Sequence, residues 1–355
     1  MSEPATIATS RLSAQLLGLE HSADVEGVVQ RLLAIQAQDE RAFRLAVRAR
    51  SSGLDVAAVD EALSSQRTLV VSWLCRGTLH LVGADDYWWL HQLTSVRGLT
   101  GNATRLRQLG VSEKQTEAAI EVILGEVALR PSTRKELAAA LEDAGLPVAG
   151  QALVHLLNAA SLRAHLVRGP MRDRDHCFVD AEQWLKRPPA ALGQEELLAR
   201  LARRYLTGHG PASAQDLAVF GGVTLGDARR GFDAIAADTL DLGNGIVHLR
   251  GQSLTDVPPP PRLLGMFDPV LHGWADRSFV LGTYPGVVTS NGMFRATALV
   301  GGRVVGTWSI PSGVVTLQTP RALARRVREE LGRQAHDVLR FLGLAPADLL
   351  VVEDS

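Results

Sequence analysis

Two glutamines, Gln36 and Gln38, stand on either side of Ala37, where one helical pattern pauses and another begins. Apolar residues recur at helical spacing over 25–35 and again over 39–50. Residues at i and i+2 do not share one face of a helix, so a surface helix gives no reason to pair these amides. In an irregular junction both could point into one cavity. The alternative is that both glutamines are simply solvated, as most are.

The residue that follows, Asp39, has two interpretations. Its carboxylate could cap the second helix by accepting a backbone N–H two or three residues further on. It could also act as a general base beside the glutamines, since a carboxylate is a common proton acceptor in enzymes. The sequence favours the capping role and leaves the general-base role open.

The rest of the chain offers few other groups for catalysis. Its ten histidines are scattered, and Cys75 and Cys177 are far apart in sequence, so we expect no metal site and no cofactor. There is no glycine-rich phosphate loop and no serine nucleophile motif. The three lysines do not lie in apolar runs, which argues against a lyase that forms a Schiff base. With these mechanisms excluded, a reaction catalysed by this chain would be one that neutral polar groups can support.

Composition sets further limits on the function. The net charge of −1 gives no overall attraction to nucleic acid, although nearly all of the 37 basic residues are arginine. Arginine suits phosphate recognition, but a GC-rich genome explains this usage more simply. The N-terminal segment lacks the features of a signal peptide, and no apolar run approaches the roughly 20 residues that span a bilayer. We therefore expect a cytoplasmic monomer without a membrane segment.

The hydrophobic pattern repeats three times as helix, helix, helix and hairpin, which predicts a mainly α, α+β protein made of tandem winged-helix units. A β-rich segment follows, with four strands predicted in RLLGMF, SFVLGTY, GMFRATALV and RVVGTWSI and a final helix over 321–342. The predicted divisions are the first unit over 1–110, the second over 111–190, the third over 191–257 and the C-terminal segment over 258–355.

The segments QAQD (36–39), WLCRGTLHLV (73–82) and LLGMFDPVLHGWADR (263–277) resemble the AlkZ-like family of winged-helix DNA glycosylases. The resemblance extends roughly from Arg11 to Trp308. It implies a C-shaped molecule around a concave DNA-binding surface, and Gln36 and Gln38 as the catalytic residues. It also implies a double-stranded DNA substrate carrying bulky N7-alkylpurines, possible unhooking of interstrand crosslinks, and a role in base excision repair or antibiotic resistance.

Other residues could support catalysis or bind DNA. The RGTLHL stretch supplies Arg76 and His80, which could assist the glutamines or could be structural. The predicted wing of the second unit has a basic tip, although a solvated loop is an equal alternative. A second hairpin turns at Gly301-Gly302 and could enter a DNA groove. The predicted DNA-binding residues are Arg168, Arg172, Arg174, Arg277 and Arg303.

The sequence therefore favours a monofunctional DNA glycosylase. The alternative is a non-enzymatic DNA-binding protein or transcription regulator, because winged helices more often bind DNA than act on it. The predicted recognition helix of the second unit contains the nearly apolar run ALVHLL (152–157), which is poor in residues that read base edges. This composition favours the enzyme over the regulator.

Overall fold

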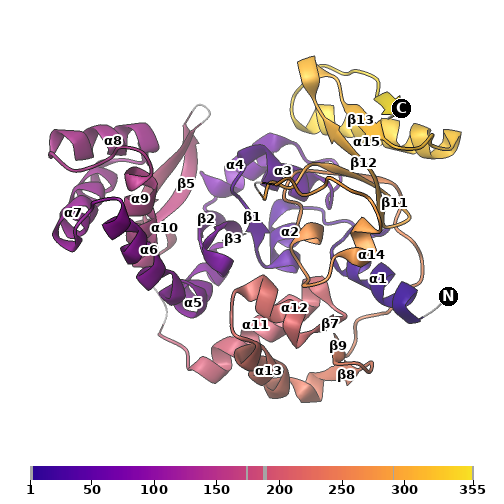
Figure 1. The fold of residues 1–355 in the computed structure, drawn as a ribbon, viewed down its shortest axis with the longest axis horizontal. Helices are drawn as coiled ribbons and strands as arrows, with labels where there is room; N and C mark the ends of the chain where they lie inside the picture. The colour runs from indigo at the N-terminus through magenta and orange to yellow at the C-terminus, as the bar shows by residue number, and fades with distance from the viewer. Residues whose placement is uncertain (1–2, 173–174, 187–189, 291, 354–355) are drawn as a thin grey trace. The chain divides into compact units, whose positions relative to one another are not determined.

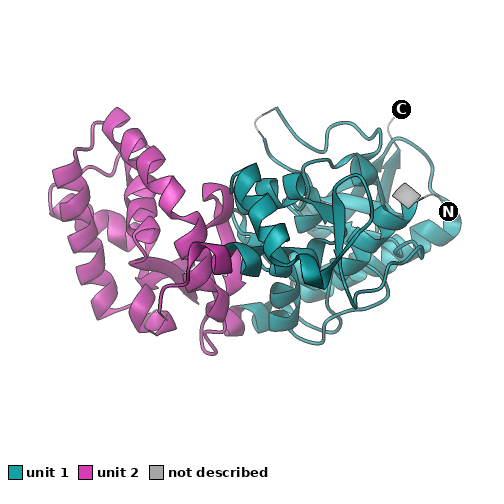
Figure 2. Cartoon of the chain, turned by 90° about the horizontal axis from the view of Figure 1, so that it is seen from below, with its two compact units in different colours: residues 1–59, 198–355 teal, residues 60–197 magenta. Residues whose placement is uncertain are grey.

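The computed structural model describes residues 3–172, 175–186, 190–290 and 292–353. The protein is mixed α/β with more helix than strand, which confirms the predicted fold class (Figure 1). The chain forms two compact units, one of residues 1–59 and 198–355 and the other of residues 60–197 (Figure 2). Across these described ranges, every helix is too short or too polar to cross a membrane. The predicted four-part division follows sequence order and stays a prediction.

Three successive segments share one order of elements: helix, two-residue strand, two helices and hairpin. The first consists of α2 (Val25–Leu32), β1 (Ile35–Gln36), α3 (Glu40–Arg48), α4 (Val56–Leu63), β2 (Leu69–Trp73) and β3 (Leu79–Gly83). The second consists of α7 (Glu113–Leu129), β4 (Ser132–Thr133), α8 (Arg134–Asp143), α9 (Ala152–Leu162), β5 (Leu166–Arg172) and β6 (Asp175–Asp180). The third consists of α11 (Gln194–His209), β7 (Ala212–Ser213), α12 (Ala214–Gly221), α13 (Leu225–Ala234), β8 (Thr239–Asp241) and β9 (Ile246–Leu249). This order is compatible with the predicted winged-helix array.

The hairpins of the first two segments join into one sheet within residues 60–197, with the strand order β3-β2-β5-β6-β4. The joint is an antiparallel pairing of Val71 with Arg168. Three helices complete this unit: α5 (Ala84–Thr94), α6 (Val96–Gln108) and α10 (Ala181–Leu185). Sequence patterns do not reveal this joint, because it pairs residues that are far apart along the chain.

The C-terminal segment forms a five-stranded sheet in the order β10-β11-β12-β13-β14. Its strands are β10 (Arg262–Leu264), β11 (Thr297–Val300), β12 (Arg303–Ser309), β13 (Thr316–Thr319) and β14 (Leu350–Glu353). The predicted turn at Gly301-Gly302 is confirmed, and both glycines have positive φ values there. Helix α15 (Arg325–Phe341) packs on β10 and α3, while α1 (Glu3–Ala14) begins the chain.

One predicted strand is wrong. The segment SFVLGTY contains a short helix, α14 (Ser278–Leu281), and no strand. The side chain of Asp276 accepts hydrogen bonds from the Ser278 backbone N at 2.8 Å and from Ser278 Oγ at 2.7 Å. Such a turn starts a helix locally and overrides the modest β preference of the apolar residues that follow.

A buried ion pair connects three parts of the compact unit formed by residues 1–59 and 198–355. Arg50, just after α3, donates from its two terminal nitrogens to the Asp268 carboxylate at 2.9 and 2.7 Å. Both side chains are completely buried. Arg50 also donates to Gln15 Oε1 at 2.9 Å, which ties in the chain just after α1. The Asp268 carboxylate also accepts a hydrogen bond from the Val270 backbone N at 3.0 Å, which satisfies a further lone pair.

Removal of Asp268 should therefore be costly. We expect Asp268→Ala to lower the free energy of unfolding by about 3–5 kcal/mol, because Arg50 would remain buried without its counter-charge. Denaturant titration followed by circular dichroism measures the change. The matched control is Asp233→Ala, which removes an exposed carboxylate of the same unit and should leave stability nearly unchanged. Equal stability of the two variants would contradict the prediction.

Candidate active site

The predicted glutamine motif lies at a junction that differs from its two counterparts. In the second and third segments the last residue of the short strand, Thr133 or Ser213, is itself the N-cap of the next helix. In the first segment β1 ends at Gln36, but the N-cap of α3 is Asp39. Three residues, Ala37, Gln38 and Asp39, therefore separate the strand from the helix in the first segment, whereas none does in the other two. This lengthening creates the irregular junction that the sequence suggested.

The two glutamine side chains contact each other. Gln36 Nε2 donates to Gln38 Oε1 at 2.6 Å. Gln36 is buried, with 7 % of its surface exposed, whereas Gln38 is exposed. The bond holds the exposed amide against the buried one, and it uses the oxygen of Gln38 so that its NH₂ group points elsewhere. The pair thus presents an ordered amide at the protein surface.

Asp39 is the helix cap that the sequence favoured. Its Oδ1 accepts from the Ala42 backbone N at 2.8 Å, and Glu40 begins the first turn of α3. This bond satisfies one of the N–H groups that a helix leaves unpaired at its start. This geometry does not test the general-base role, because only one oxygen of the carboxylate accepts the capping hydrogen bond and the other could still accept a proton.

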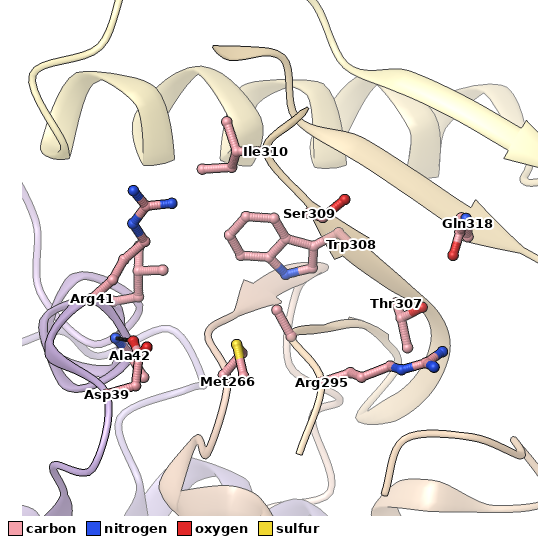
Figure 3. Close-up of a pocket in the computed structure, with 12 residues that line it drawn as sticks. Asp39, Arg41, Ala42, Met266, Arg295, Thr307, Trp308, Ser309, Ile310 and Gln318 are labelled. Carbon is pink, nitrogen blue, oxygen red and sulfur yellow. Dashed lines mark hydrogen bonds between the residues drawn. The ribbon is translucent and has the colours of Figure 1, made fainter. Parts of the chain in front are cut away.

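Asp39 also lines a pocket of about 450 Å³ within the compact unit of residues 1–59 and 198–355 (Figure 3). The start of α3 forms one wall, and strands β12 and β13 form another. Trp308 stands between these walls, and its Nε1 donates to the Leu264 carbonyl oxygen at 2.9 Å, which fixes the ring. The complete lining is Asp39, Arg41, Ala42, Leu45, Met266, Arg295, Ala296, Thr307, Trp308, Ser309, Ile310 and Gln318. Sequence analysis missed this pocket because its residues come from distant segments.

Arg76 and His80 lie together in the hairpin of β2 and β3. Arg76 occupies the tight turn with a φ of 58°, and its guanidinium lies 3.4 Å from His80 Nε2. His80 Nδ1 lies 2.9 Å from the Thr78 carbonyl oxygen, so Nδ1 carries the proton and Nε2 accepts from Arg76. Burial lowers the pKa of Arg76. These contacts give both residues a structural role, and their support of catalysis stays a prediction.

The predicted DNA-binding arginines have different surroundings. Arg168 lies over the rings of Trp73 and Phe178, at 5.4 and 5.2 Å, so it packs on its own sheet. Arg172 forms an ion pair with Glu136, and Arg174 lies outside the described residues.

The other two predicted arginines come from the C-terminal segment. Arg277 lies 5.3 Å from the ring of Phe294. Arg303 is exposed at the start of β12, beside the turn of the hairpin. None of these positions tests DNA binding, but Arg303 has the exposure that a phosphate contact needs.

Glu136 is the most strongly perturbed carboxylate near the wing. It accepts from the Thr133 backbone N at 2.8 Å, which completes a capping box, and it also pairs with Arg130 at 2.9 Å. The capping bonds first, and Arg172 and Arg130 second, lower the pKa of Glu136 to about 2. Its partner Arg172 is therefore held in a charged network rather than projecting alone. Among the described residues, no group of acidic, histidine or cysteine side chains could hold a metal ion.

A model of the AlkZ-like DNA glycosylase family matches residues 29–341. The chain belongs to this family. The solved structure of Streptomyces sahachiroi DNA glycosylase AlkZ is similar, with a TM-score of 0.80 and 21 % sequence identity over 99 % of this chain and 100 % of that chain. A comparison with curated protein sequences found no match. The AlkZ-like family assignment makes this protein a DNA glycosylase and favours the enzyme over the regulator that the sequence left open.

Two substitutions can distinguish a capping role of Asp39 from a general-base role. Asparagine caps helices about as well as aspartate, so Asp39→Asn should retain stability and, if Asp39 acts only as a cap, base release. Asp39→Ala should lower the free energy of unfolding by about 1 kcal/mol. Thr133→Ala, which removes the equivalent cap of α8, is the matched control for stability. Loss of base release by a stable Asp39→Asn variant would instead identify Asp39 as the general base.

Proposed function

We propose that this AlkZ-like protein hydrolyses the N-glycosidic bond of N7-alkylguanine in double-stranded DNA, including bulky adducts, and that it unhooks interstrand crosslinks. Gln36 and Gln38 are the catalytic residues in this proposal. The observation that carries it is the hydrogen-bonded glutamine pair at a junction that is lengthened only in the first of the three segments. Two biological roles fit this reaction: base excision repair and self-resistance to a DNA-alkylating natural product.

The chemistry of the substrate explains why neutral amides suffice. A guanine alkylated at N7 is cationic, so it leaves as a neutral base without protonation by a strong acid. The enzyme must place one water molecule beneath the sugar and stabilise the positive charge that develops there. A glutamine oxygen has two lone pairs and can accept from that water, and its dipole favours the developing charge. The NH₂ group of exposed Gln38 can donate to a phosphate or sugar oxygen.

The pairing of the two amides also orients them before substrate arrives. Since Gln36 is buried and bonded to Gln38, the exposed amide loses rotational freedom in the free enzyme rather than during the reaction. Preorganised dipoles of this kind stabilise a transition state without paying for reorganisation when the charge develops. Arg303 and Arg172, together with Arg168, Arg174 and Arg277, are the residues that we propose to contact DNA.

The glutamines are tested by single-turnover release of N7-methylguanine from duplex DNA. Gln36→Ala and Gln38→Ala should each slow base release by about 10²-fold, since removing one preorganised group typically costs that much. DNA affinity should change little, because neither residue is charged. Gln66→Ala, at an exposed position elsewhere, is the control. Rates close to wild type for both motif variants would refute the mechanism.

The product distinguishes a monofunctional enzyme from a lyase. The lysines Lys114, Lys135 and Lys186 are all exposed and all lie in residues 60–197, outside the unit that contains the glutamines. A lysine nucleophile usually needs a desolvated pocket that lowers its pKa. We therefore expect an intact abasic site, strand breakage only after alkali, and no covalent complex after borohydride treatment. A trapped protein–DNA adduct would show that the reaction is of the lyase class.

A further inference from the structure

The pocket beside Asp39 has the composition of a ligand site. Its volume of about 450 Å³ falls within the range of about 300–1,000 Å³ that is typical of small-molecule sites. Leu45, Met266 and Ile310 give it apolar walls around the ring of Trp308. The polar side chains of Thr307, Ser309 and Gln318 also line it, and Figure 3 shows them on the β12 and β13 side.

Two arginines give this apolar pocket its charge. Arg41 from α3 and Arg295 from the segment before β11 lie on opposite sides of Trp308 (Figure 3). Both are exposed, and neither forms an ion pair or side-chain hydrogen bond with the described residues. The Asp39 carboxylate caps α3 through one oxygen. The guanidinium groups are therefore available to donate to oxygen atoms of a ligand.

The pocket is continuous in sequence with the glutamine motif. Gln38 is followed directly by Asp39, and the first turns of α3 supply Arg41, Ala42 and Leu45 to the lining. All of these residues belong to the same compact unit. The lining of the pocket therefore begins at the residue directly after Gln38.

We propose that this pocket binds the non-base part of a bulky N7-guanine adduct, an aromatic or apolar body that carries carbonyl or other oxygen acceptors. This inference rests on the proposed function and names the part of the substrate that the pocket selects. Trp308 and the apolar walls contact the body, while Arg41 and Arg295 donate to its oxygens. A methyl adduct has no group to place there, so the pocket contributes only to bulky lesions. Phosphates of DNA share the acceptor chemistry, but they are present in both kinds of substrate.

The test compares two duplexes of one sequence, one with N7-methylguanine and one with the N7-guanine adduct of aflatoxin B1 epoxide, a fused aromatic body with carbonyl oxygens. Ser309→Trp places a large ring at an exposed pocket position, and Arg41→Ala and Arg295→Ala remove the donors. Each variant should slow release of the aflatoxin adduct about tenfold or more, as loss of a fitted contact does. Release of N7-methylguanine should remain at the wild-type rate. Arg326→Ala, which removes an exposed arginine on α15 outside the pocket, is the matched control.

The outcomes separate the two levels of the proposal. Selective slowing of the aflatoxin adduct supports the pocket as its binding site. Equal slowing of both substrates shows that the arginines contact DNA phosphates, and it overturns the pocket inference while the proposed function stands. Unchanged release of both substrates by all three variants also overturns it. A wild-type enzyme that releases neither base refutes the proposed function, and the inference fails with it.

Discussion

The buried pair of Arg50 and Asp268 is the interaction on which the compact unit of residues 1–59 and 198–355 depends. It connects the end of α3, the chain after α1 and the start of the C-terminal segment, which no sequence-local contact could join. Such a pair adds little net stability over apolar packing. However, neither partner can be buried without the other, because an unpaired buried charge is strongly destabilising. Its consequence is positional: α3 is fixed against the C-terminal segment, and the pocket beside Asp39 lies between these same two parts.

A second constraint operates at the start of α3. The cap at Asp39 fixes where the helix begins, and a hydrogen bond between Gln36 and Gln38 orients these two side chains just before the cap. The helix start, the amide pair and the pocket wall are thus set by one short stretch of chain. The proposed reaction uses no strong acid or metal, so its rate depends on orientation and dipoles, and rigid placement of this kind meets that requirement.

Much of the fold could be predicted from the sequence because it is encoded locally. The hairpin at Gly301-Gly302, the cap at Asp39 and the helix at the C-terminus all follow from neighbouring residues. The strand predicted over SFVLGTY was wrong because a single side chain, Asp276, outweighs weak β preference. The position of Gln36 and Gln38 between two helices was evident from the sequence pattern, whereas their catalytic role was predicted through family resemblance.

The joint between β2 and β5, and the pocket around Trp308, could not be predicted from the sequence. Both bring together residues that are far apart along the chain, and no periodicity records such contacts.

The three segments offer three equivalent junctions between a short strand and a helix, and only the first is extended. Lengthening a connection by three residues costs little entropy, since the closure penalty grows only logarithmically with length. A capping hydrogen bond starts the helix in every segment, so the longer connection does not alter how the helix begins. A repeated scaffold can therefore change one junction while the corresponding junctions of the other two segments keep their original length. In the proposed function, adaptation to a new lesion would change residues at this junction and in the adjoining pocket, while the three segments keep their fold.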